Sequence, residues 1–334
     1  MDTNPLQTGD KAPRDRNNPV RRASSESDYS LMEFMRMFPN DAACLDQLWR
    51  DRFAPDGHHA YCPSDRCLRE RKFHRTKTRS SYTCDSCGLH VHPQKGTIFE
   101  RSSTSLHLWF YAMYLMASTR CGISAKQMER ELGVTYKQAH KMMKRIRTLM
   151  GDDGDPLSGD VEVDETSWGG KPRKEHGQHP NIAVGPVDRR AAGKAHAEAK
   201  PTILGMVERG GKLRFRVIAN RRGPALSREV RANIDPSSII FTDDWQAYKP
   251  LRGEYLDHKI INHSAGEYVV GDVYTNTIEG AFGNLKTGMR GVYKKVSPAY
   301  LQAYLDEYAW RHNAKRDDGA LFLQLLDRAA SGAQ

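Results

Sequence analysis

Acidic residues at separate points of the chain are spaced for divalent-cation chemistry. In the stretch 160–170 (DVEVDETSWGG), valines alternate with Glu162 and Asp164, which is the pattern of a half-buried strand. An unpaired charge is costly to remove from water, and hard cations such as Mg²⁺ prefer carboxylate oxygens as ligands. We therefore interpret this acidic strand as one side of a metal site.

Two later stretches supply the remaining acids of such a site. An apolar run ends at Asp243 and Asp244, and the stretch 276–280 (NTIEG) opens a helical run that contains Glu279. With Asp164, the acids Asp243 and Glu279 would bind two metal ions, and paired ions about 3.5–4 Å apart promote phosphodiester chemistry. Local alternatives remain for each acid: Glu162 or Glu165 for Asp164, Asp244 for Asp243, and an ordinary first-turn helix acid for Glu279.

The cysteines form a second pattern with a chemical meaning. Two pairs, Cys62 with Cys67 and Cys84 with Cys87, are separated by 16 residues, which matches a four-thiolate zinc ribbon. A tetrahedral Zn²⁺ would replace the core that so short a segment cannot build. The first pair has more intervening residues than usual, so a histidine is an alternative ligand: His58, His59, His74, His90 or His92. Free thiols in a small β-rich module are the other interpretation.

The composition is that of a basic chain. Its 334 residues carry a formal net charge of +10, so more than one domain and a polyanionic partner are expected, although a solvated basic surface is an alternative. No apolar run approaches the roughly 20 residues that cross a bilayer. The polar N-terminus is not a signal peptide. We therefore expect no membrane association, a cytoplasmic location and reduced cysteines.

Two capping boxes and a turn predict a helix-turn-helix. The stretch 124–127 begins one helix, 132–134 forms the turn, and 135–138 begins the second helix. A recognition helix would place its basic side chains against phosphates and base edges. The candidates for these DNA contacts are Lys137, Lys141, Lys144, Arg145 and Arg147. The alternative is an ordinary amphipathic helix pair that joins two domains.

The remaining pattern predicts an α/β fold. Strands are expected at the acidic stretch and at 201–208, 212–219, 238–243 and 258–263, with a helix at 224–234 and terminal helices from 279 and 298. This order favours a mixed five-stranded sheet with helices on both faces. That is a ribonuclease H-like arrangement, with Asp164 on the first strand, Asp243 ending the fourth, and Glu279 on a following helix.

These elements suggest a division of the chain. We expect a disordered tail at 1–28, an N-terminal helix and zinc ribbon at 29–100, and a helix-turn-helix DNA-binding region at 101–150. A linker at 151–159 precedes the catalytic domain at 160–320, and a tail is expected at 321–334. Within the catalytic domain, 169–200 is expected to be a long mobile loop.

Taken in order, these blocks resemble the DDE transposases of bacterial insertion sequences, in the zinc-ribbon-bearing ISXO-type group related to Merlin elements. The resemblance runs from about Phe38 to Lys315. Its blocks are FPNDAAC, the two Cys pairs, GTIFERS, ISAKQMERELGVTYKQAHKMMKRIR, VEVDETSWGGK, FTDDWQAY, NHSAGEYV, NTIEGAFGNLKTGMRGVY and YLDEYAWRHN. The wide first Cys pair is the main departure from the family pattern.

The resemblance implies a DNA transposase that binds terminal inverted repeats and catalyses metal-dependent strand cleavage and strand transfer. Asp164, Asp243 and Glu279 would be the catalytic carboxylates that hold two Mg²⁺ (or Mn²⁺) ions. Structural Zn²⁺ would be held by Cys62, Cys67, Cys84 and Cys87. Lys286, on the same helix face as Glu279, would contact phosphate, with a solvated lysine as the alternative.

The resemblance also implies partners and a location. Two DNA ends must be joined, so a homodimer or higher oligomer on element and target DNA is expected, on the bacterial nucleoid. Two other functions compete with this one. The chain would then be a non-catalytic DNA-binding regulator derived from a transposase, or a ribonuclease H-like structure-selective nuclease.

Overall fold

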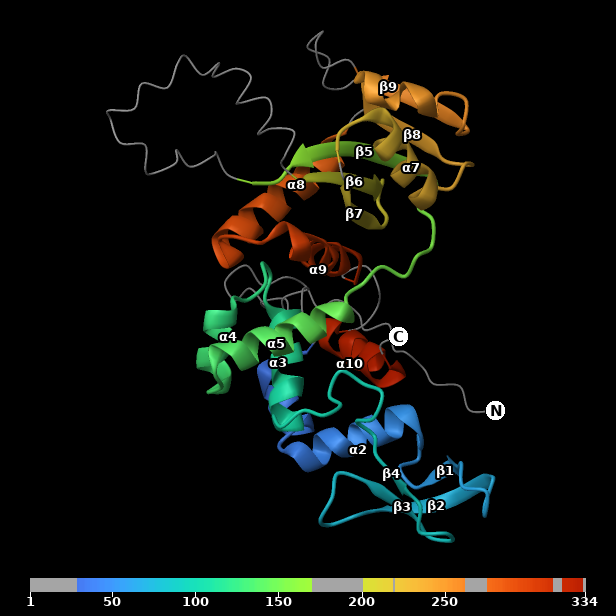
Figure 1. The fold of residues 1–334 in the computed structure, drawn as a ribbon, viewed down its shortest axis with the longest axis vertical. Coiled ribbons are helices and arrows are strands. Elements are labelled where there is room, and N and C mark those ends of the chain that lie inside the picture. The colour runs from blue at the N-terminus through green and yellow to red at the C-terminus, as the bar shows by residue number, and fades with distance from the viewer. Residues whose placement is uncertain (1–28, 170–200, 219, 262–274, 315–319, 333–334) are drawn as a thin grey trace, which may run out of the picture.

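The computed structural model describes residues 29–169, 201–218, 220–261, 275–314 and 320–332, which form two stacked parts (Figure 1). One part contains a small sheet and several helices, and the other contains a larger sheet with helices on it. The predicted tail at 1–28 and nearly all of the predicted loop, 170–200, lie outside the described residues.

Two helices begin the described chain. α1 (Leu31–Met37) starts with a capping box at Ser30. α2 (Asp41–Arg52) starts after Asn40, whose side chain accepts a backbone N–H bond of 3.1 Å from the first turn. The apolar face of α2 is buried, and Cys44 is a core residue on that face.

A four-stranded antiparallel sheet follows, with its strands in chain order. The strands are short: β1 (His59–Cys62), β2 (Arg69–Arg75), β3 (Tyr82–Cys84) and β4 (His90–Val91). Trp49 of α2 stacks on Tyr82 of β3 with ring centroids 4.2 Å apart, so α2 covers one face of this sheet. Its cysteines lie at the strand ends and turns.

Three helices form the next layer: α3 (Leu106–Ser118), α4 (Ala125–Leu132) and α5 (Tyr136–Thr148). Ser124 and Thr135 cap α4 and α5, each accepting a bond from the backbone N–H three residues later. Gly133 ends α4 at φ +64°, a left-handed conformation that glycine adopts readily. The predicted caps Ser124 and Thr135 and the turn between the helices are confirmed, but the glutamines do not complete the capping boxes: Gln127 bonds Glu131 and Gln138 bonds Thr104.

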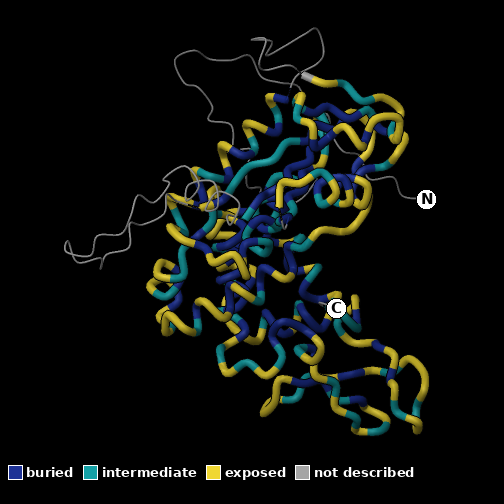
Figure 2. Tube along the Cα trace, turned by 45° about the horizontal axis from the view of Figure 1, so that its top comes forward, coloured by how far each residue is buried: buried dark blue, intermediate teal, exposed yellow. Residues whose placement is uncertain are grey.

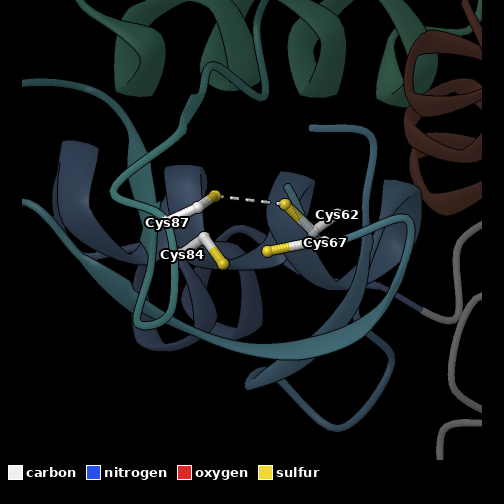
Figure 3. Close-up of side chains that lie close together, drawn as sticks. All are labelled: Cys62, Cys67, Cys84 and Cys87. Carbon is white, nitrogen blue, oxygen red and sulfur yellow. Dashed lines mark hydrogen bonds between the residues drawn. The ribbon is translucent and has the colours of Figure 1, made fainter. Parts of the chain in front are cut away.

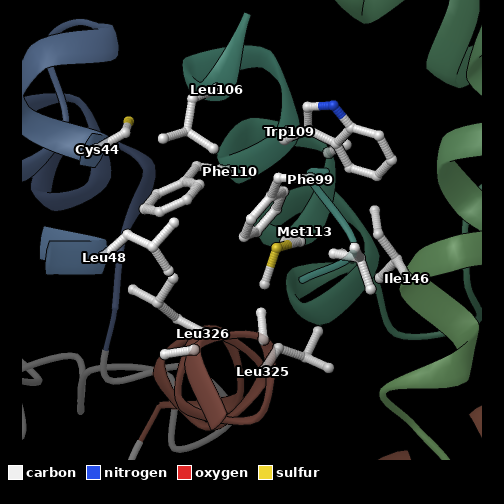
Figure 4. Packing of buried hydrophobic residues seen from close by; sticks show 14 of the residues in the cluster. Cys44, Leu48, Phe99, Leu106, Trp109, Phe110, Met113, Ile146, Leu325 and Leu326 are labelled. Atoms are coloured by element: carbon white, nitrogen blue, oxygen red, sulfur yellow. The ribbon is translucent and has the colours of Figure 1, made fainter. Parts of the chain in front are cut away.

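The C-terminal helix belongs to the core of the first part. α10 (Leu321–Ser331) packs on α2 and α3, and Leu325 and Leu326 share one cluster with Leu48 and Phe110 (Figure 4). The predicted tail at 321–334 is therefore wrong over these residues. Apolar side chains recur there at helical spacing, and they are buried against helices from the opposite end of the chain.

The second part is built on a mixed five-stranded sheet in the order β7–β6–β5–β8–β9. Three strands form an antiparallel meander: β5 (Asp160–Ser167), β6 (Thr202–Glu208) and β7 (Leu213–Ile218). After helix α7 (Gly223–Asn233), the strands β8 (Ile239–Asp243) and β9 (Asp257–Ile261) join in parallel. The predicted mixed sheet is confirmed, and the acidic strand lies at its centre.

Helices cover both faces of this sheet. α7 and the 3₁₀ helix η1 (Gln246–Leu251) share one cluster with Val161 and Val163 of β5. On the other face lie α8 (Asn276–Gly288) and α9 (Leu301–Ala314), joined by the short helices η3 (Met289–Tyr293) and η4 (Pro298–Tyr300). Figure 2 shows buried residues running through the interior of both parts and exposed residues at their surfaces.

The predicted linker at 151–159 is irregular but anchored. Arg214 of β7 donates to the Asp152 carboxylate at 2.7 Å, and Arg328 of α10 donates to Asp153 at 2.8 Å. The Leu157 N–H donates to the carbonyl of Asn233, the last residue of α7, and the Leu157 carbonyl accepts from Asp235, each at 2.8 Å. Contacts to three elements therefore fix this segment, although its composition is that of a linker.

Candidate functional site

Asp164 lies on the central strand, on the face that α8 covers. It pairs across the sheet with Gly205 of β6, which is directly beneath α8 side chains. Its Oδ1 atom accepts a bond of 2.7 Å from the Glu165 backbone N–H. Burial, and then the negative charges of Asp243 and Glu279, raise the pKa of Asp164 to about 6.

Asp243 is the last residue of β8, beside Asp164. β5 and β8 are parallel and pair as far as Glu162 with Phe241, so Asp164 and Asp243 each lie two residues beyond the last pair, on the same side of it. The Asp243 Oδ1 atom accepts a bond of 3.1 Å from the Trp245 backbone N–H. The parallel pairing therefore brings two acids from distant parts of the sequence to one edge of the sheet.

Glu279 reaches the same region from a helix. It lies in the first turn of α8 and is exposed. Its charge contributes to the raised pKa of Asp164, as does that of Asp243. The three acids predicted from the sequence thus come from a central strand, a strand end and a helix. Their ligand atoms do not form a group within 4.8 Å, because among the described residues only four cysteines do so.

The chemistry of these donors fits a divalent cation. Arg221 lowers the pKa of Asp164, yet burial and the neighbouring carboxylates outweigh it. A divalent cation would offset both effects, and carboxylate oxygens are the ligands that Mg²⁺ prefers. Asp164, Asp243 and Glu279 are therefore suitable residues to hold Mg²⁺ or Mn²⁺.

Two of the alternative acids already have partners within the protein. Glu162 is fully buried and accepts hydrogen bonds from Arg209 and from the start of α8. Glu165 accepts the hydroxyl of Tyr248 at 2.6 Å and pairs with Arg221 at 3.1 Å. The third alternative, Asp244, is exposed. These contacts favour Asp164 over its two neighbours as a cation ligand.

Four thiols converge at one end of the small sheet (Figure 3). Cys62 ends β1 and Cys84 ends β3, and Cys67 and Cys87 lie in the loops that follow. All four sulfur atoms lie within 4.8 Å of one another. The Leu89 backbone N–H lowers the pKa of Cys87 to about 6. Zinc–sulfur bonds of about 2.3 Å in a tetrahedron suit sulfur atoms at such separations.

The wide first Cys pair still reaches the cluster. The Cys67 and Leu68 backbone N–H groups both bond the Ser64 carbonyl, at 2.7 and 3.0 Å, and Leu68 adopts φ +43°. A tight turn thus takes up the extra residues. Within the described ranges no histidine joins the sulfur cluster, and two of the predicted alternatives, His59 and His74, contact aspartates instead.

The basic face of α5 is only partly available to DNA. Lys137, Lys141 and Lys144 are exposed. Arg145 is half-buried, and its guanidinium donates to the Ile98 and Glu100 carbonyls at 3.0 and 3.2 Å. The three lysines therefore remain the exposed candidates, although the Lys144 ammonium group also lies 5.1 Å from the centroid of the Tyr300 ring.

Arg147 does not belong to that face. It is 4% exposed, and its Nε atom donates to Glu307 of α9 at 2.7 Å. Its guanidinium also lies 4.0 Å from the centroid of the Tyr304 ring. The prediction that Arg147 contacts DNA is wrong, because this side chain is enclosed between α5 and α9 and joins the two parts of the chain.

Lys286 lies on α8, two turns after Glu279. It is half-buried, and its ammonium group is 5.6 Å from the centroid of the Phe282 ring. The stem therefore packs along the helix while the charge stays at the surface. A phosphate contact by Lys286 stays a prediction.

Sequence reasoning missed the structural roles of two buried acids, one of which it had named as an alternative to Asp164. Glu162 and Glu307 are both fully buried. For Glu162 a signal was present, because it alternates with valines and shares its strand face with Asp164. For Glu307 the signal was weaker. A single glutamate in a helical segment is usually exposed, and only the contact with Arg147 explains why this one is buried.

In the part of the chain that the structure describes, none of the helices combines the length and the apolar character that a bilayer span needs.

Comparisons with known proteins add a family. Residues 156–313 match a family model described as the ISXO2-like transposase domain. A Halobacterium salinarum protein, "Uncharacterized protein in transposable element ISH50", is 28% identical over 268 residues, which are 80% of this chain and 90% of that protein. A Haemophilus influenzae "Uncharacterized transposase-like protein" is 27% identical over 97 residues, 29% of this chain and 77% of that protein.

One solved structure aligns more distantly. The "Crystal structure of a pre-cleavage Mos1 transpososome" covers 67% of this chain and 79% of its own chain, at 11% identity and a TM-score of 0.23. A TM-score this low does not establish a shared fold.

Proposed function

Residues 156–313 belong to the ISXO2-like transposase family, and from this premise we propose that the protein is a DNA transposase. It would bind the terminal inverted repeats of an insertion element, cleave strands there and transfer the freed ends into target DNA. The observation that carries the proposal is the placement of Asp164 on the central strand, Asp243 at the end of the adjacent parallel strand, and Glu279 in the first turn of the helix on that face.

In this proposal the three carboxylates hold the divalent ions, two Mg²⁺ or Mn²⁺ by the family resemblance. When bound, such ions activate the attacking oxygen and stabilise the leaving one. The protein's own part is positioning: a central strand presents Asp164, the adjacent strand end presents Asp243, and α8 presents Glu279. Lys286 on the same helix would bind a phosphate.

The proposed reaction has two steps. Water attacks a phosphodiester at the element's end and releases a 3′-hydroxyl group. That hydroxyl then attacks a phosphodiester of the target DNA in line, and the target strand's own 3′-oxygen leaves as a hydroxyl group. No covalent intermediate with the protein forms.

We infer that the catalytic domain is ribonuclease H-like. The central β5 between antiparallel β6 and parallel β8 supports this inference. So does the placement of acids on the first strand, at the end of the fourth strand, and on a later helix. The proposed domain spans 160–320 and is preceded by the linker at 151–159.

The remaining residues would form the DNA-binding part, with a zinc ribbon at 29–100 and a helix-turn-helix at 101–150. One hydrophobic cluster contains residues of both regions and of α10. We therefore propose that 29–150 and 321–331 act as one unit. Its DNA contacts would come from Lys137, Lys141 and Lys144, and Zn²⁺ would be held by the four cysteines of the small sheet.

The assembly and location follow from the proposed reaction. Two element ends must be joined, so we propose a homodimer or higher oligomer on DNA. The reaction takes place on DNA, so we propose that the protein acts in the bacterial cytoplasm, at the nucleoid.

The test is an incubation of purified protein with DNA that carries the gene's own flanking sequence. The arms are Mg²⁺, EDTA, and Asp243→Ala with Mg²⁺, with Asp244→Asn as a matched control because its carboxylate is an exposed neighbour. Nicks are mapped to the nucleotide and joined products are measured. We expect cuts at matching inverted ends and joined products with Mg²⁺, and neither in EDTA or in Asp243→Ala.

Other outcomes would change the assignment. Cleavage that persists in Asp164→Ala, Asp243→Ala and Glu279→Ala would sink the catalytic role of these acids. Salt-sensitive binding without cleavage in every arm would favour the regulator. Cleavage of branched junctions or hybrids without joining would favour the nuclease.

A further inference from the structure

Glu162 makes an unusual set of contacts for a strand residue. It is fully buried, and its Oε1 atom accepts bonds from Arg209 Nε at 3.1 Å and from the Thr277 hydroxyl at 3.0 Å. Its Oε2 atom accepts the backbone N–H groups of Thr277 and Ile278 at 2.9 and 3.0 Å. One carboxylate of β5 thus bonds two consecutive amides at the start of α8.

Those amides have no acceptor within the helix itself. The first N–H groups of a helix have no carbonyl within the helix, and a capping side chain usually accepts from the second or third residue. The residue before α8 is Thr275, which makes no side-chain capping bond. Glu162 therefore caps α8 from a strand more than a hundred residues away, and its negative charge also suits the positive end of the helix dipole.

The cap lies between two of the proposed catalytic acids. Glu162 is two residues before Asp164 on one strand face, and the amide of Ile278 immediately precedes Glu279. Across the sheet, a side chain on Gly205 would place its Cβ 2.6 Å from Ile278 Cδ1, so the absence of one lets α8 approach the strand beside Asp164.

The other side of Glu162 is held as well. Arg209 follows β6, and its guanidinium carbon lies 3.7 Å from the centroid of the Phe241 ring. Phe241 of β8 is level with Glu162 in the sheet. The neighbouring strands therefore fix the position of the Arg209 guanidinium, which is the counter-charge of the buried Glu162 carboxylate.

We propose that Glu162 is a positioning residue that holds the first turn of α8 on the central strand, and so sets the place of Glu279 relative to Asp164. Its effect on catalysis rests on the proposed function. Its effect on α8 does not, because the cap is a property of the protein without DNA. Glu162 acts through Glu279 and is not itself a ligand of the ions.

The first experiment uses the unaltered, full-length protein. Amides of a first helical turn ordinarily exchange with solvent readily, because they have no intrahelical partner. Bonded to Glu162, the amides of Thr277 and Ile278 should instead exchange as slowly as those in the middle of α8. Exchange at the rate of an open turn would overturn the proposal, whatever a variant does.

The second experiment compares Glu162→Gln with Glu254→Gln by hydrogen exchange, DNA affinity and single-turnover cleavage. Glutamine turns one oxygen into a donor that faces N–H groups. Glu254 is a matched control, because it also bonds an arginine, Arg231, but on the surface. We expect faster exchange confined to the start of α8, unchanged DNA affinity, and cleavage slower by about 100-fold, the order of loss that a 1 Å misplacement causes.

The outcomes separate the two proposals. Glu162→Gln with unaltered α8 exchange and unaltered cleavage would contradict the positioning role. Absence of cleavage by the unaltered protein would count against the transposase alone, and the exchange measurements would still decide the role of Glu162. If Glu162→Gln does not fold, the exchange of the unaltered protein decides it.

Discussion

Asp164 and Glu162 show how environment separates two acids that the sequence cannot distinguish. Both residues alternate with valines on β5, so they share one face of the strand, which is the face that α8 covers. Among the described residues, Glu162 has donors for both oxygens, whereas Asp164 has one backbone donor, from Glu165, and two acidic neighbours. A satisfied buried carboxylate is structural, and a repelled one is available to a cation.

The raised pKa of Asp164 gives a prediction about pH. Its pKa rises from 3.8 to about 6 on folding, so the native protein binds more protons between these values, and stability falls as pH rises through them. Without metal at pH 8, Asp164→Asn should therefore have a free energy of unfolding about 3 kcal/mol above that of the unaltered protein, and so a higher melting temperature. Near pH 4 the difference should nearly vanish.

Differential scanning calorimetry in EDTA measures this, with Asp244→Asn as the control. Added Mg²⁺ should stabilise the unaltered protein but not Asp164→Asn, because the bound ion offsets the repulsion. A lower melting temperature for Asp164→Asn at pH 8 in EDTA would show that the ionised Asp164 carboxylate does not destabilise the folded protein.

The thiol cluster gives a second prediction at this scale. Cys84→Ser should reduce zinc from one equivalent per chain to near zero and destabilise the first part, since structural zinc contributes folding free energy. Cys121→Ser is the control, because Cys121 is exposed and outside the cluster. Elemental analysis of both variants decides, and unchanged zinc in Cys84→Ser would refute this ligand. Acid should release the zinc as the thiolates are protonated.

At the scale of elements, α5 has two faces with different tasks. Its apolar residues and Arg147 pack inward, and Lys137, Lys141 and Lys144 point to solvent. The cap at Thr135 and the left-handed Gly133 fix the angle between α4 and α5. The element is therefore rigid enough to present charge in one pattern.

We expect Lys141→Ala to weaken DNA binding with little dependence on sequence. If it contacts one phosphate, the slope of log affinity against log salt should fall in magnitude by about 0.9. Arg228→Ala on α7 is the control, since it removes an equal charge from a side chain that is 75% exposed on the other part. Equal slopes for Lys141→Ala and the unaltered protein, from titrations at several salt concentrations, would remove α5 from the interface.

At the scale of the whole molecule, one buried network joins the two parts. The Glu307 carboxylate of α9 accepts three hydrogen bonds: from Arg147 of α5 at 2.7 Å, from Arg311 at 2.6 Å and from the Tyr293 hydroxyl at 2.9 Å. Tyr293 belongs to η3, which continues α8. The network therefore connects the proposed recognition helix with the helix that carries Glu279.

Glu307→Gln should leave two buried arginines without their counter-charge, which costs about 3–5 kcal/mol. Burial opposes ionisation of Glu307, but the charges of Arg147 and Arg311 outweigh it and lower its pKa. Its stabilisation is thus present at neutral pH and lost as pH falls through the lowered pKa. Denaturant unfolding should show that the difference in free energy of unfolding between the unaltered protein and Glu307→Gln becomes smaller in acid. A difference that stays constant with pH would contradict the ion network. Glu254→Gln should show a small gap at every pH.

Local patterns in the sequence determined much of this protein. Alternation, caps and turn residues predicted β5, α2, α4, α5 and the mixed sheet, because these signals act between residues near in the chain. The acids, the cysteines and their chemistry were also legible from residue type and spacing. Predictions of this kind do not depend on contacts between residues that are distant in the sequence.

Only the tertiary structure decided which side chains are buried against which partners. The structure showed that the predicted C-terminal tail is helix α10, and that Arg147 is buried against Glu307 and does not face DNA. It also showed that Glu162 caps α8. Each depends on contacts between residues more than a hundred positions apart. Burial and pairing across such distances are set by packing of whole elements, and a linear pattern carries little information about them.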